Sequence, residues 1–177
     1  DVLVIDSYST DATLDICRSF PNVRVVQRKF DTFADQCNWG LTHVTGEWVL
    51  SMDADYVLSD ALISELKSLT PDSTIHGYYV PFKYCIFGKP LRATLLPPRC
   101  SVYRRSSAHY ENDGHAHRVV IDGSTGMLKG HLHHDDRKSL SRWFNAQNRY
   151  SEQEATKLLA KSPSELGRND RIRLKTV

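Results

Sequence analysis

The stretch that decides the fold covers residues 46–55 and reads Gly-Glu-Trp-Val-Leu-Ser-Met-Asp-Ala-Asp. Its apolar run, Trp48–Met52, ends on two carboxylates one residue apart, Asp53 and Asp55. In an open α/β sheet, ligands bind beyond the carboxyl ends of the strands. Paired carboxylates there suit a hard divalent cation such as Mg²⁺, which keeps phosphate oxygens among its other ligands. The stretch therefore predicts a metal-bridged nucleotide diphosphate, and an ordinary Asp turn is the simpler interpretation.

The first 70 residues alternate between short apolar runs and segments with apolar side chains at helical spacing. We expect strands over Val2–Ile5, Val23–Val26 and Trp48–Met52, and helices after Asp11, over Phe33–Val44 and from Asp60 onward. Continuous apolar strands that alternate with helices are typical of a parallel sheet covered on both faces. Because the carboxyl ends of parallel strands lie at one edge of the sheet, we expect Asp6 and Asp53 to line one crevice.

After Pro71 the sequence becomes aromatic, then rich in histidine, and finally helical. Aromatic strands are expected over Gly77–Tyr84 and Ser101–Arg104, and a His-rich stretch runs from His109 to Asp136. Residues 140–158 carry apolar side chains on one face, which predicts a long helix. No repeat or linker is visible. We therefore expect one α/β domain over residues 1–177, with a nucleotide-binding half (1–70), an acceptor and catalytic half (71–137) and a C-terminal helical segment (138–177).

The composition is that of an ordinary globular domain. Among 177 residues, 23 basic and 21 acidic side chains give a formal net charge of +2, so no nucleic-acid partner is expected. Four scattered cysteines without a C-x-x-C pair predict free thiols. Residues 168–175 are basic with interleaved apolar side chains, which is typical of either an anionic membrane contact or a solvated helix end. Because the chain lacks an initiator Met and opens inside a strand, we expect it to be a fragment.

Several segments resemble the family-2 glycosyltransferases. Residues 4–11, Val-Ile-Asp-Ser-Tyr-Ser-Thr-Asp, are similar to that family's V-x-D-x-S-x-D segment, and residues 33–41 and 46–55 look like its helix and D-x-D strand. The segments His-Asp-Asp-Arg-Lys (134–138) and Asn-Arg-Tyr-Ser-x-x-Glu-Ala (148–155) resemble the bacterial branch related to lipopolysaccharide-core glucosyltransferases. The resemblance implies a GT-A fold, a nucleotide-diphospho-sugar donor, Mg or Mn, and transfer with inversion. The family's first strand has no counterpart here.

The resemblance also implies roles for individual residues. It places Asp6 and Ser7 at the nucleoside, Asp53 at the ribose or metal, and Asp55 on the metal. It gives His133 or else His134 as a further metal ligand, and Arg137 or else Lys138 at the donor phosphates. Asp11 is expected to cap the following helix. The implied acceptor is a cell-envelope glycan or lipid-linked glycan. The implied location is the cytoplasm, at the inner face of a bacterial plasma membrane.

An inverting transfer needs a general base that takes the proton of the acceptor hydroxyl. Some relatives carry His-Glu-His in this region, with the carboxylate where Ala116 stands here. We therefore expect Asp113 to be the base, with Glu111 and His115 as alternatives. The simpler interpretation of Asp113 is an Asp-Gly turn.

Two other function classes stay open on the sequence. The residues His115, His117, His133, His134 and Asp135 are types that ligate zinc, which would suit a zinc or two-metal hydrolase. A non-catalytic nucleotide-sugar-binding domain is the other possibility, because the family's first strand is missing.

Overall fold

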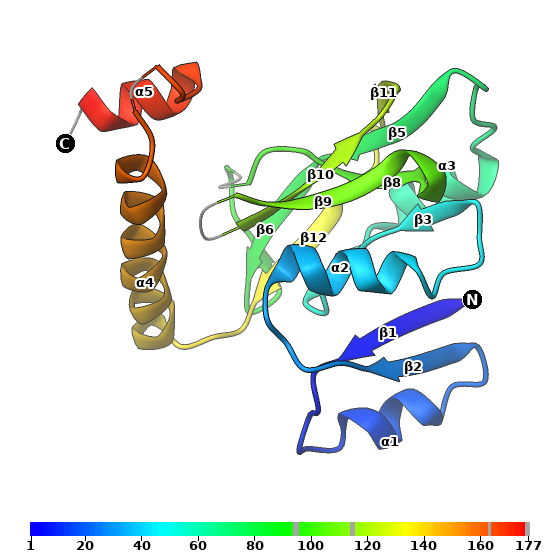
Figure 1. The fold of residues 1–177 in the computed structure, drawn as a ribbon. Coiled ribbons are helices and arrows are strands. Elements are labelled where there is room, and N and C mark those ends of the chain that lie inside the picture. Colours follow the sequence, from blue (N-terminus) through cyan, green and yellow to red (C-terminus); the bar gives the residue numbers. More distant parts are fainter. Residues whose placement is uncertain (94–95, 114–115, 163, 176–177) are drawn as a thin grey trace. The chain divides into compact units, whose positions relative to one another are not determined.

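The computed structural model describes residues 1–93, 96–113, 116–162 and 164–175. These divide into two compact units, and each is described by itself. The first holds residues 1–111 and 119–137, and the second holds residues 112–118 and 138–177. Residue 137, after which we expected the helical segment, is also where the first unit ends. Figure 1 colours the chain from blue to red along its length.

The first unit opens with a parallel strand pair. Strand β1 (Val2–Asp6) pairs in register with β2 (Val23–Gln27), and the helix α1 (Thr13–Arg18) connects them. Helix α2 (Phe33–Leu41) begins at Thr32, whose side chain accepts a hydrogen bond from the Asp35 amide. It ends three residues before the predicted Val44.

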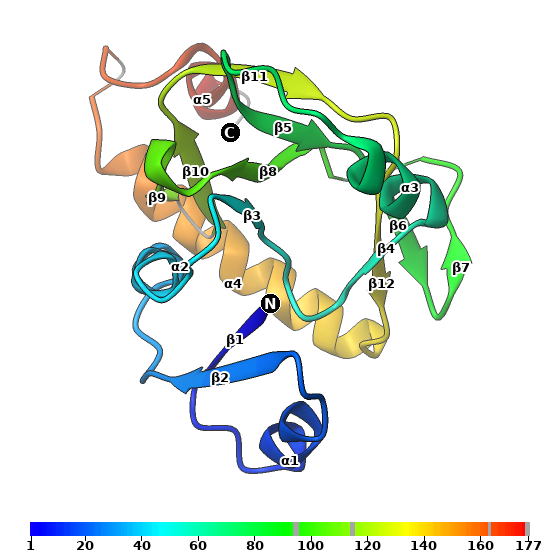
Figure 2. The same ribbon diagram turned by 90° about the vertical axis from the view of Figure 1, so that its right-hand side faces the viewer.

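Two four-stranded sheets make up most of the remaining first unit. One has the order β11-β5-β8-β3, and its strands are Ser124–Met127, Ile75–Val80, Arg99–Arg104 and Trp48–Leu50. The other has the order β4-β12-β6-β7, and its strands are Tyr56–Leu58, Leu132–Asp136, Phe82–Ile86 and Lys89–Pro90. Figure 2 shows β5, β8 and β3 side by side, with β12 and β6 next to each other. Helix α3 (Asp60–Ser68) starts at its predicted position, where Ser59 caps the Leu62 amide.

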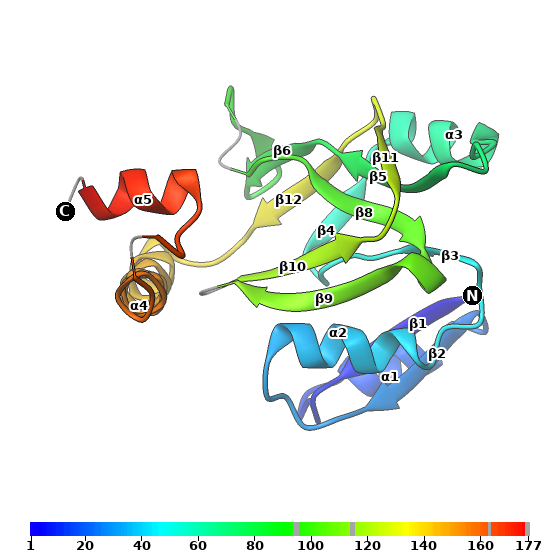
Figure 3. The ribbon, with the colours of Figure 1, turned by 45° about the horizontal axis from the view of Figure 1, so that its top comes forward.

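A hairpin and a short helix complete the connections. The turn η1 (Arg105–Ser107) leads into β9 (Ala108–Asp113), which pairs with β10 (Ala116–Ile121). Figure 3 shows this hairpin above α2. In the described part of the chain all four cysteines are free, as expected. No helix described is both long and apolar enough to cross a bilayer.

The expectation of a mostly parallel sheet is wrong in detail. Within the described residues β1 does not pair with β3, whose strand partner is β8, in antiparallel fashion. Of the other pairs, β11–β5 and β12–β6 are parallel, whereas β4, β7 and β8 pair in antiparallel fashion. β1 and β3 nevertheless run in the same direction (Figures 1 and 3). Asp6 and Asp53 thus follow strand ends that point the same way, although in different sheets.

Helix α2 packs between β1 and the sheet of order β11-β5-β8-β3. A Cβ atom on Gly40 would lie 2.2 Å from Ile5 Cδ1, so the helix approaches β1 closely. On its other side Ala34, Cys37 and Leu41 pack with the buried Tyr103 and its neighbours. Packing against apolar surface on both sides is what stabilises a nine-residue helix, which is too short to be stable alone.

A second core cluster lies under α3. It contains Leu62, Val80, Phe82 and Leu132 among its buried members, and Leu62, Val80 and Leu132 are fully inaccessible to solvent. These side chains join α3 to both four-stranded sheets. Burial of each such side chain stabilises the fold by about 1.5–3 kcal/mol.

The second unit is mainly helical. The long helix predicted from its apolar face is α4 (Leu140–Leu159), and Ser139 caps its start. Helix α5 (Arg168–Lys175) follows. Leu158 and Leu166 are its buried apolar side chains among the residues described. Lys157 on α4 lies 2.5 Å from Asp113 of the hairpin tip and 3.6 Å from Asp170 of α5. One ammonium group therefore connects three segments of this unit.

We predict that Gly130→Ala destabilises the first unit. A Cβ atom at this buried position would lie 2.4 Å from the Leu62 Cα atom and 2.5 Å from its amide nitrogen, so α3 would have to move. Overpacking of this kind costs about 1–3 kcal/mol of unfolding free energy, which thermal or urea unfolding would measure. Gly167→Ala is the control, because no described atom lies within 4 Å of its Cβ position. An unchanged midpoint for Gly130→Ala would show that α3 does not pack here as described.

Candidate functional site

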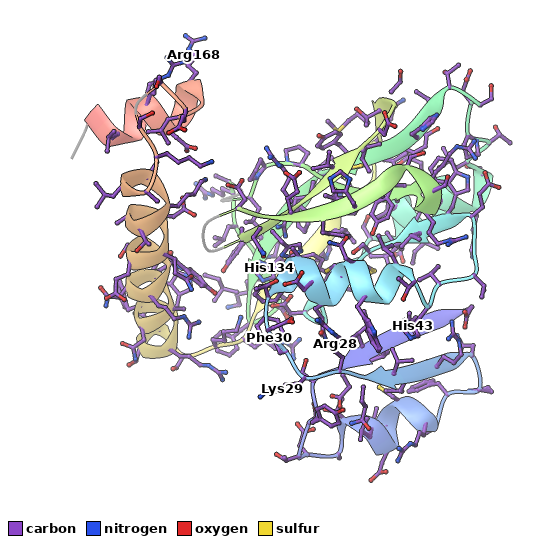
Figure 4. The ribbon with its side chains drawn as sticks, in the orientation of Figure 1. Arg28, Lys29, Phe30, His43, His134 and Arg168 are labelled. Atoms are coloured by element: carbon purple, nitrogen blue, oxygen red, sulfur yellow. The ribbon has the colours of Figure 1, made fainter. Side chains whose placement is uncertain are left out.

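The clearest polar contact near the D-x-D turn joins Asp55 to His134. Strand β12 lies between β4 and β6, so that His134 is opposite Tyr56 on one side and Tyr84 on the other. Both tyrosine rings meet the imidazole edge to face, at centroid distances of 5.4 and 4.8 Å. The Nε2 atom of His134 lies 3.1 Å from Asp55 Oδ2. Figure 4 labels His134 on this strand.

The two ring nitrogens of His134 have different surroundings. Nδ1 is buried and has no hydrogen-bond partner within the described structure, whereas Nε2 faces the carboxylate. Nε2 can donate a proton to Asp55, or it can bind a cation beside the carboxylate when it is unprotonated. The Asp55 side chain keeps 38% of its surface exposed, so this pair is open to a ligand.

His133, our first choice as the histidine ligand, is not at this contact. Side chains alternate along a strand, so His133 and His134 lie on opposite faces of β12. The ring of His133 lies 4.9 Å from that of His131 instead. The structure therefore favours His134, the alternative residue, as the partner of Asp55.

Asp53 lies beside an arginine that the sequence did not single out. Arg99 Nη1, at the start of β8, lies 3.9 Å from Asp53 Oδ2 and donates a 3.2 Å hydrogen bond to the Tyr56 hydroxyl. Burial, together with the nearby Asp53 carboxylate, raises the pKa of Tyr56. Tyr56 is thus a neutral donor or acceptor at all working pH values. No sequence motif marks Arg99, since its place at the turn depends on the tertiary fold.

The donor set limits which metal these residues fit. Among the residues described, no three or more His, Cys, Asp or Glu side chains converge to hold an ion. The structure therefore gives no support to a zinc hydrolase site built from protein ligands alone, although His115 lies outside the described residues. The Asp55 carboxylate fits a cation that takes few protein ligands and completes its shell with substrate oxygens and water, as Mg²⁺ does. The His134 imidazole would add a nitrogen donor, which is the less usual ligand for such a hard cation.

Asp6 is buried at the end of β1 and is fully engaged locally. Its carboxylate accepts hydrogen bonds from the Ser9 hydroxyl at 2.5 Å, the Ser9 amide at 3.1 Å and the Gln27 side chain at 2.9 Å. The Ser9 hydroxyl, then Gln27, lower the pKa of Asp6, and these bonds outweigh the opposing effect of burial. Asp6 is therefore ionised and held rigidly in the loop that follows the strand.

The rest of this loop is held by α2. Ser7 Oγ accepts a 3.2 Å hydrogen bond from Gln36 Nε2, and Gln36 Oε1 accepts one from Arg28. Arg28, labelled in Figure 4, also forms a two-fold contact with Asp31. Tyr8, which follows Ser7 in this loop, is exposed and has a left-handed backbone with φ 61°. Such a conformation is uncommon for a residue other than glycine.

Arg137 is attached to the turn between β6 and β7. Its Nε atom donates a 2.7 Å hydrogen bond to Asp135 Oδ2, and Asp135 Oδ1 accepts one from the Gly88 amide. The Arg137 side chain remains 75% exposed and can meet an anion. Its predicted contact with the donor phosphates stays a prediction.

The expected base lies in the second unit, whereas the D-x-D turn lies in the first. Asp113 pairs with Lys157, whose ammonium is the main cause of the lowered pKa of this carboxyl. The alternative Glu111 belongs to the first unit and lies 3.4 Å from the His109 ring. The third candidate, His115, and the adjacent Gly114 lie outside the described residues.

A buried hydrogen-bond network fixes β9 near the D-x-D turn. The Tyr110 hydroxyl lies 2.7 Å from that of Tyr103 and donates to Ser51 Oγ at 2.8 Å, two residues before Asp53. The backbone of Tyr110 bonds with both side-chain atoms of Asn38 on α2. Fully satisfied networks of this kind make a site rigid.

Comparison with known proteins agrees with these features. Residues 1–77 match the profile described as "Glycosyl transferase family 2". Over these residues the chain is similar to the family-2 glycosyltransferases. The SPbeta prophage-derived glycosyltransferase SunS of Bacillus subtilis is 38% identical over 61 residues, which are 33% of this chain and 14% of SunS. The "Uncharacterized glycosyltransferase RP128" of Rickettsia prowazekii is 24% identical over 173 residues, 90% of this chain and 59% of RP128.

The chain thus spans less than two thirds of the length of either relative. Among solved structures, S. aureus TarS 1-349 in complex with UDP-GlcNAc aligns with a TM-score of 0.56 and 14% identity, over 87% of this chain and 57% of TarS. At that identity the likeness shows the fold alone. The expected GT-A α/β fold is confirmed, whereas the lipopolysaccharide-core branch stays a prediction.

We predict that Asp6→Asn removes a stabilising contribution that depends on pH. The folded-state pKa of Asp6 is lowered, so its charge stabilises the fold above the ordinary value of 3.8 and loses this effect as the pH falls through the folded value. The gap in unfolding free energy between wild type and Asp6→Asn should therefore be large at pH 6 and shrink below pH 3.8. Denaturant unfolding at several pH values measures this gap. Asp15→Asn, on the exposed face of α1, is the control, and an equal gap at every pH would contradict the assignment.

Proposed function

We propose that this chain is the catalytic domain of a metal-dependent, inverting glycosyltransferase. It transfers a sugar from a nucleotide-diphospho-sugar to a hydroxyl of a cell-envelope glycan or lipid-linked acceptor, at the inner face of a bacterial plasma membrane. The observation that carries the proposal is the contact between Asp55, in the turn between β3 and β4, and His134 in the middle of β12. The match of residues 1–77 to the family profile supports it independently.

The donor proposal concerns the loop after β1 and the D-x-D turn. Side chains of β2 and α2 hold Asp6 and Ser7, so the loop after β1 has a fixed conformation against which a nucleoside can bind. Asp53 and Arg99 together offer an acceptor and a donor for ribose or phosphate groups, and Arg137 offers a second cation. The TarS structure was determined in complex with UDP-GlcNAc, which supports this class of donor.

The proposed cation is Mg²⁺ or Mn²⁺. Asp55 and His134 would hold it, with Asp53 nearby in the same turn. When bound, such a cation neutralises the charge that develops on the leaving diphosphate. The protein's own contribution is to fix these ligands, because Tyr56 and Tyr84 restrict the His134 ring and β4 pairs with β12 next to the turn.

Asp113 remains our proposal for the general base, and this assignment rests on the sequence pattern. Its lowered pKa keeps it ionised at neutral pH, which a proton acceptor requires. The same ion pair weakens it as a base, since base strength falls with pKa. The Lys157 contact therefore becomes a test of the role.

The metal proposal predicts different effects for two adjacent histidines. Asp55→Ala should abolish Mn²⁺-dependent donor binding. His134→Gln should weaken it on the order of tenfold, because it removes the group beside the carboxylate. Thermal shift and calorimetry with UDP-GlcNAc and related nucleotide sugars, with and without Mn²⁺, measure the effect. His133→Gln is the matched control, because its ring lies on the other face of β12, and an equal loss in that variant would reject His134 as a ligand.

The base proposal predicts a shift in the pH profile of turnover. Asp113→Asn should lower turnover on the order of 10²–10⁴-fold with little change in donor affinity, because proton abstraction contributes in the transition state. Lys157→Met should raise the pKa of Asp113 and move the acidic limb of the profile to higher pH. Glu111→Gln is the control and should be milder. If Asp113→Asn keeps near-full turnover and Glu111→Gln has none, the general base is Glu111 and not Asp113.

A further inference from the structure

The hairpin made by β6 and β7 exposes apolar side chains next to Asp55 and His134. Along one face of β6 the exposed fraction rises from 6% at Phe82 to 7% at Tyr84 and 44% at Ile86. These residues are in register with Leu132, His134 and Asp136 of β12, so Ile86 lies on the same face as His134. The buried face of this sheet thus reaches solvent just beyond the D-x-D contact.

The tip of this hairpin presents an aromatic ring at an energetic cost. Ile86 pairs with Lys89, so Phe87 and Gly88 form a two-residue turn, with φ values of 48° and 77°. Such turns favour Asn or Gly at the first position, because a side chain there is strained in the left-handed region. Phe87 nevertheless occupies it and is 64% exposed. A backbone outlier of this kind is a reason to look for a function of the side chain.

The turn is also fixed from below. The Gly88 amide donates a 2.7 Å hydrogen bond to Asp135, whose other oxygen is held by Arg137. Leu91, 38% exposed, adds a third apolar side chain, and its amide donates to the Tyr84 carbonyl. Ile86, Phe87 and Leu91 therefore form one small apolar patch, which we name the hairpin patch.

The charged side chains on the hairpin itself are all cations. Lys83, Lys89 and Arg92 are exposed on the same hairpin and its continuation. The sequence contains no Asp or Glu from residue 73 to residue 110. Asp135, the carboxylate that accepts the hydrogen bond from the Gly88 amide, is paired with Arg137. Exposed apolar side chains surrounded by cations are suited to the headgroup layer of an anionic bilayer.

We propose that the hairpin patch inserts into an anionic membrane surface and so presents the Asp55–His134 site to an acceptor held in that membrane. The role of the patch in presenting the site to an acceptor rests on the proposed function. Binding of the patch to a membrane does not require the protein to be active. A second copy of the chain is a poorer occupant, because the same cations would face one another. The patch is distinct from residues 168–175, the basic segment whose sequence is typical of either a membrane contact or a solvated helix end.

The test is flotation of the whole chain with vesicles of phosphatidylcholine containing phosphatidylglycerol, beside vesicles of phosphatidylcholine alone. We expect binding to the anionic vesicles that weakens with added salt. Phe87→Gly should weaken it roughly tenfold, because it removes the largest apolar group of the patch. The melting temperature of this variant should be equal or higher, because glycine adopts the left-handed backbone without strain. If Phe87 had a purely structural role, Phe87→Gly would have a lower melting temperature than the wild type.

Charge and position have their own controls. Changing Lys83, Lys89 and Arg92 to Ser should weaken binding about fivefold for each charge removed. Phe20→Ala on the segment after α1 and Phe144→Ala on α4 remove rings that are 53% and 58% exposed, and neither should change vesicle binding.

The proposal is overturned if the wild-type chain ignores anionic vesicles, if Phe87→Gly binds them as tightly as wild type, or if Phe144→Ala is the variant that loses binding. It is also overturned if Phe87→Gly slows transfer to a soluble glycan acceptor without changing vesicle binding, which would make the patch a sugar platform. Donor binding with Mn²⁺ is measured on the same samples. Its absence rejects the proposed transferase and leaves the membrane result standing on its own.

Discussion

The contact between His134 and Asp55 is the interaction on which the candidate site depends. It requires β12 to lie between β4 and β6, so that one imidazole is enclosed by Tyr56 and Tyr84 and reaches the D-x-D turn with a single nitrogen. A shift of one residue in the register of β12 would place His133 there instead. The buried Leu132, two residues earlier on the same face, opposes such a shift, because it would become exposed.

This dependence explains what could be predicted from the sequence and what could not. Apolar runs and helix caps are local, so β1, β2, α3 and α4 were placed nearly to the residue. The choice between His133 and His134 depends on which face of β12 is buried, and two adjacent histidines carry no such information. Arg99 could not be found for a similar reason, since it meets Asp53 only after β8 pairs with β3.

The sheet arrangement shows where the parallel pattern misled us. Strand–helix alternation predicted parallel partners, and β1–β2 obeys it. Beyond residue 70 the helices give way to consecutive strands, and strands joined by tight turns pair in antiparallel fashion. The result is a mixed sheet system in which α2, packed on Ile5 and on the Tyr103 cluster, provides the connection that a continuous sheet would otherwise supply.

At two positions, Tyr8 and Phe87, the fold imposes a backbone conformation that is unfavourable for the residue present. Each is an exposed aromatic residue in a left-handed backbone, and each lies within two residues of the end of a strand that carries a proposed site residue or its neighbour. A sequence selected for stability alone would place glycine or asparagine at both positions, because these residues adopt the left-handed backbone with little strain. Strain that is kept where a ring is presented to solvent is better explained by ligand contact than by packing. The same reasoning separates them from Phe20, which is equally exposed and has no strained backbone in the described structure.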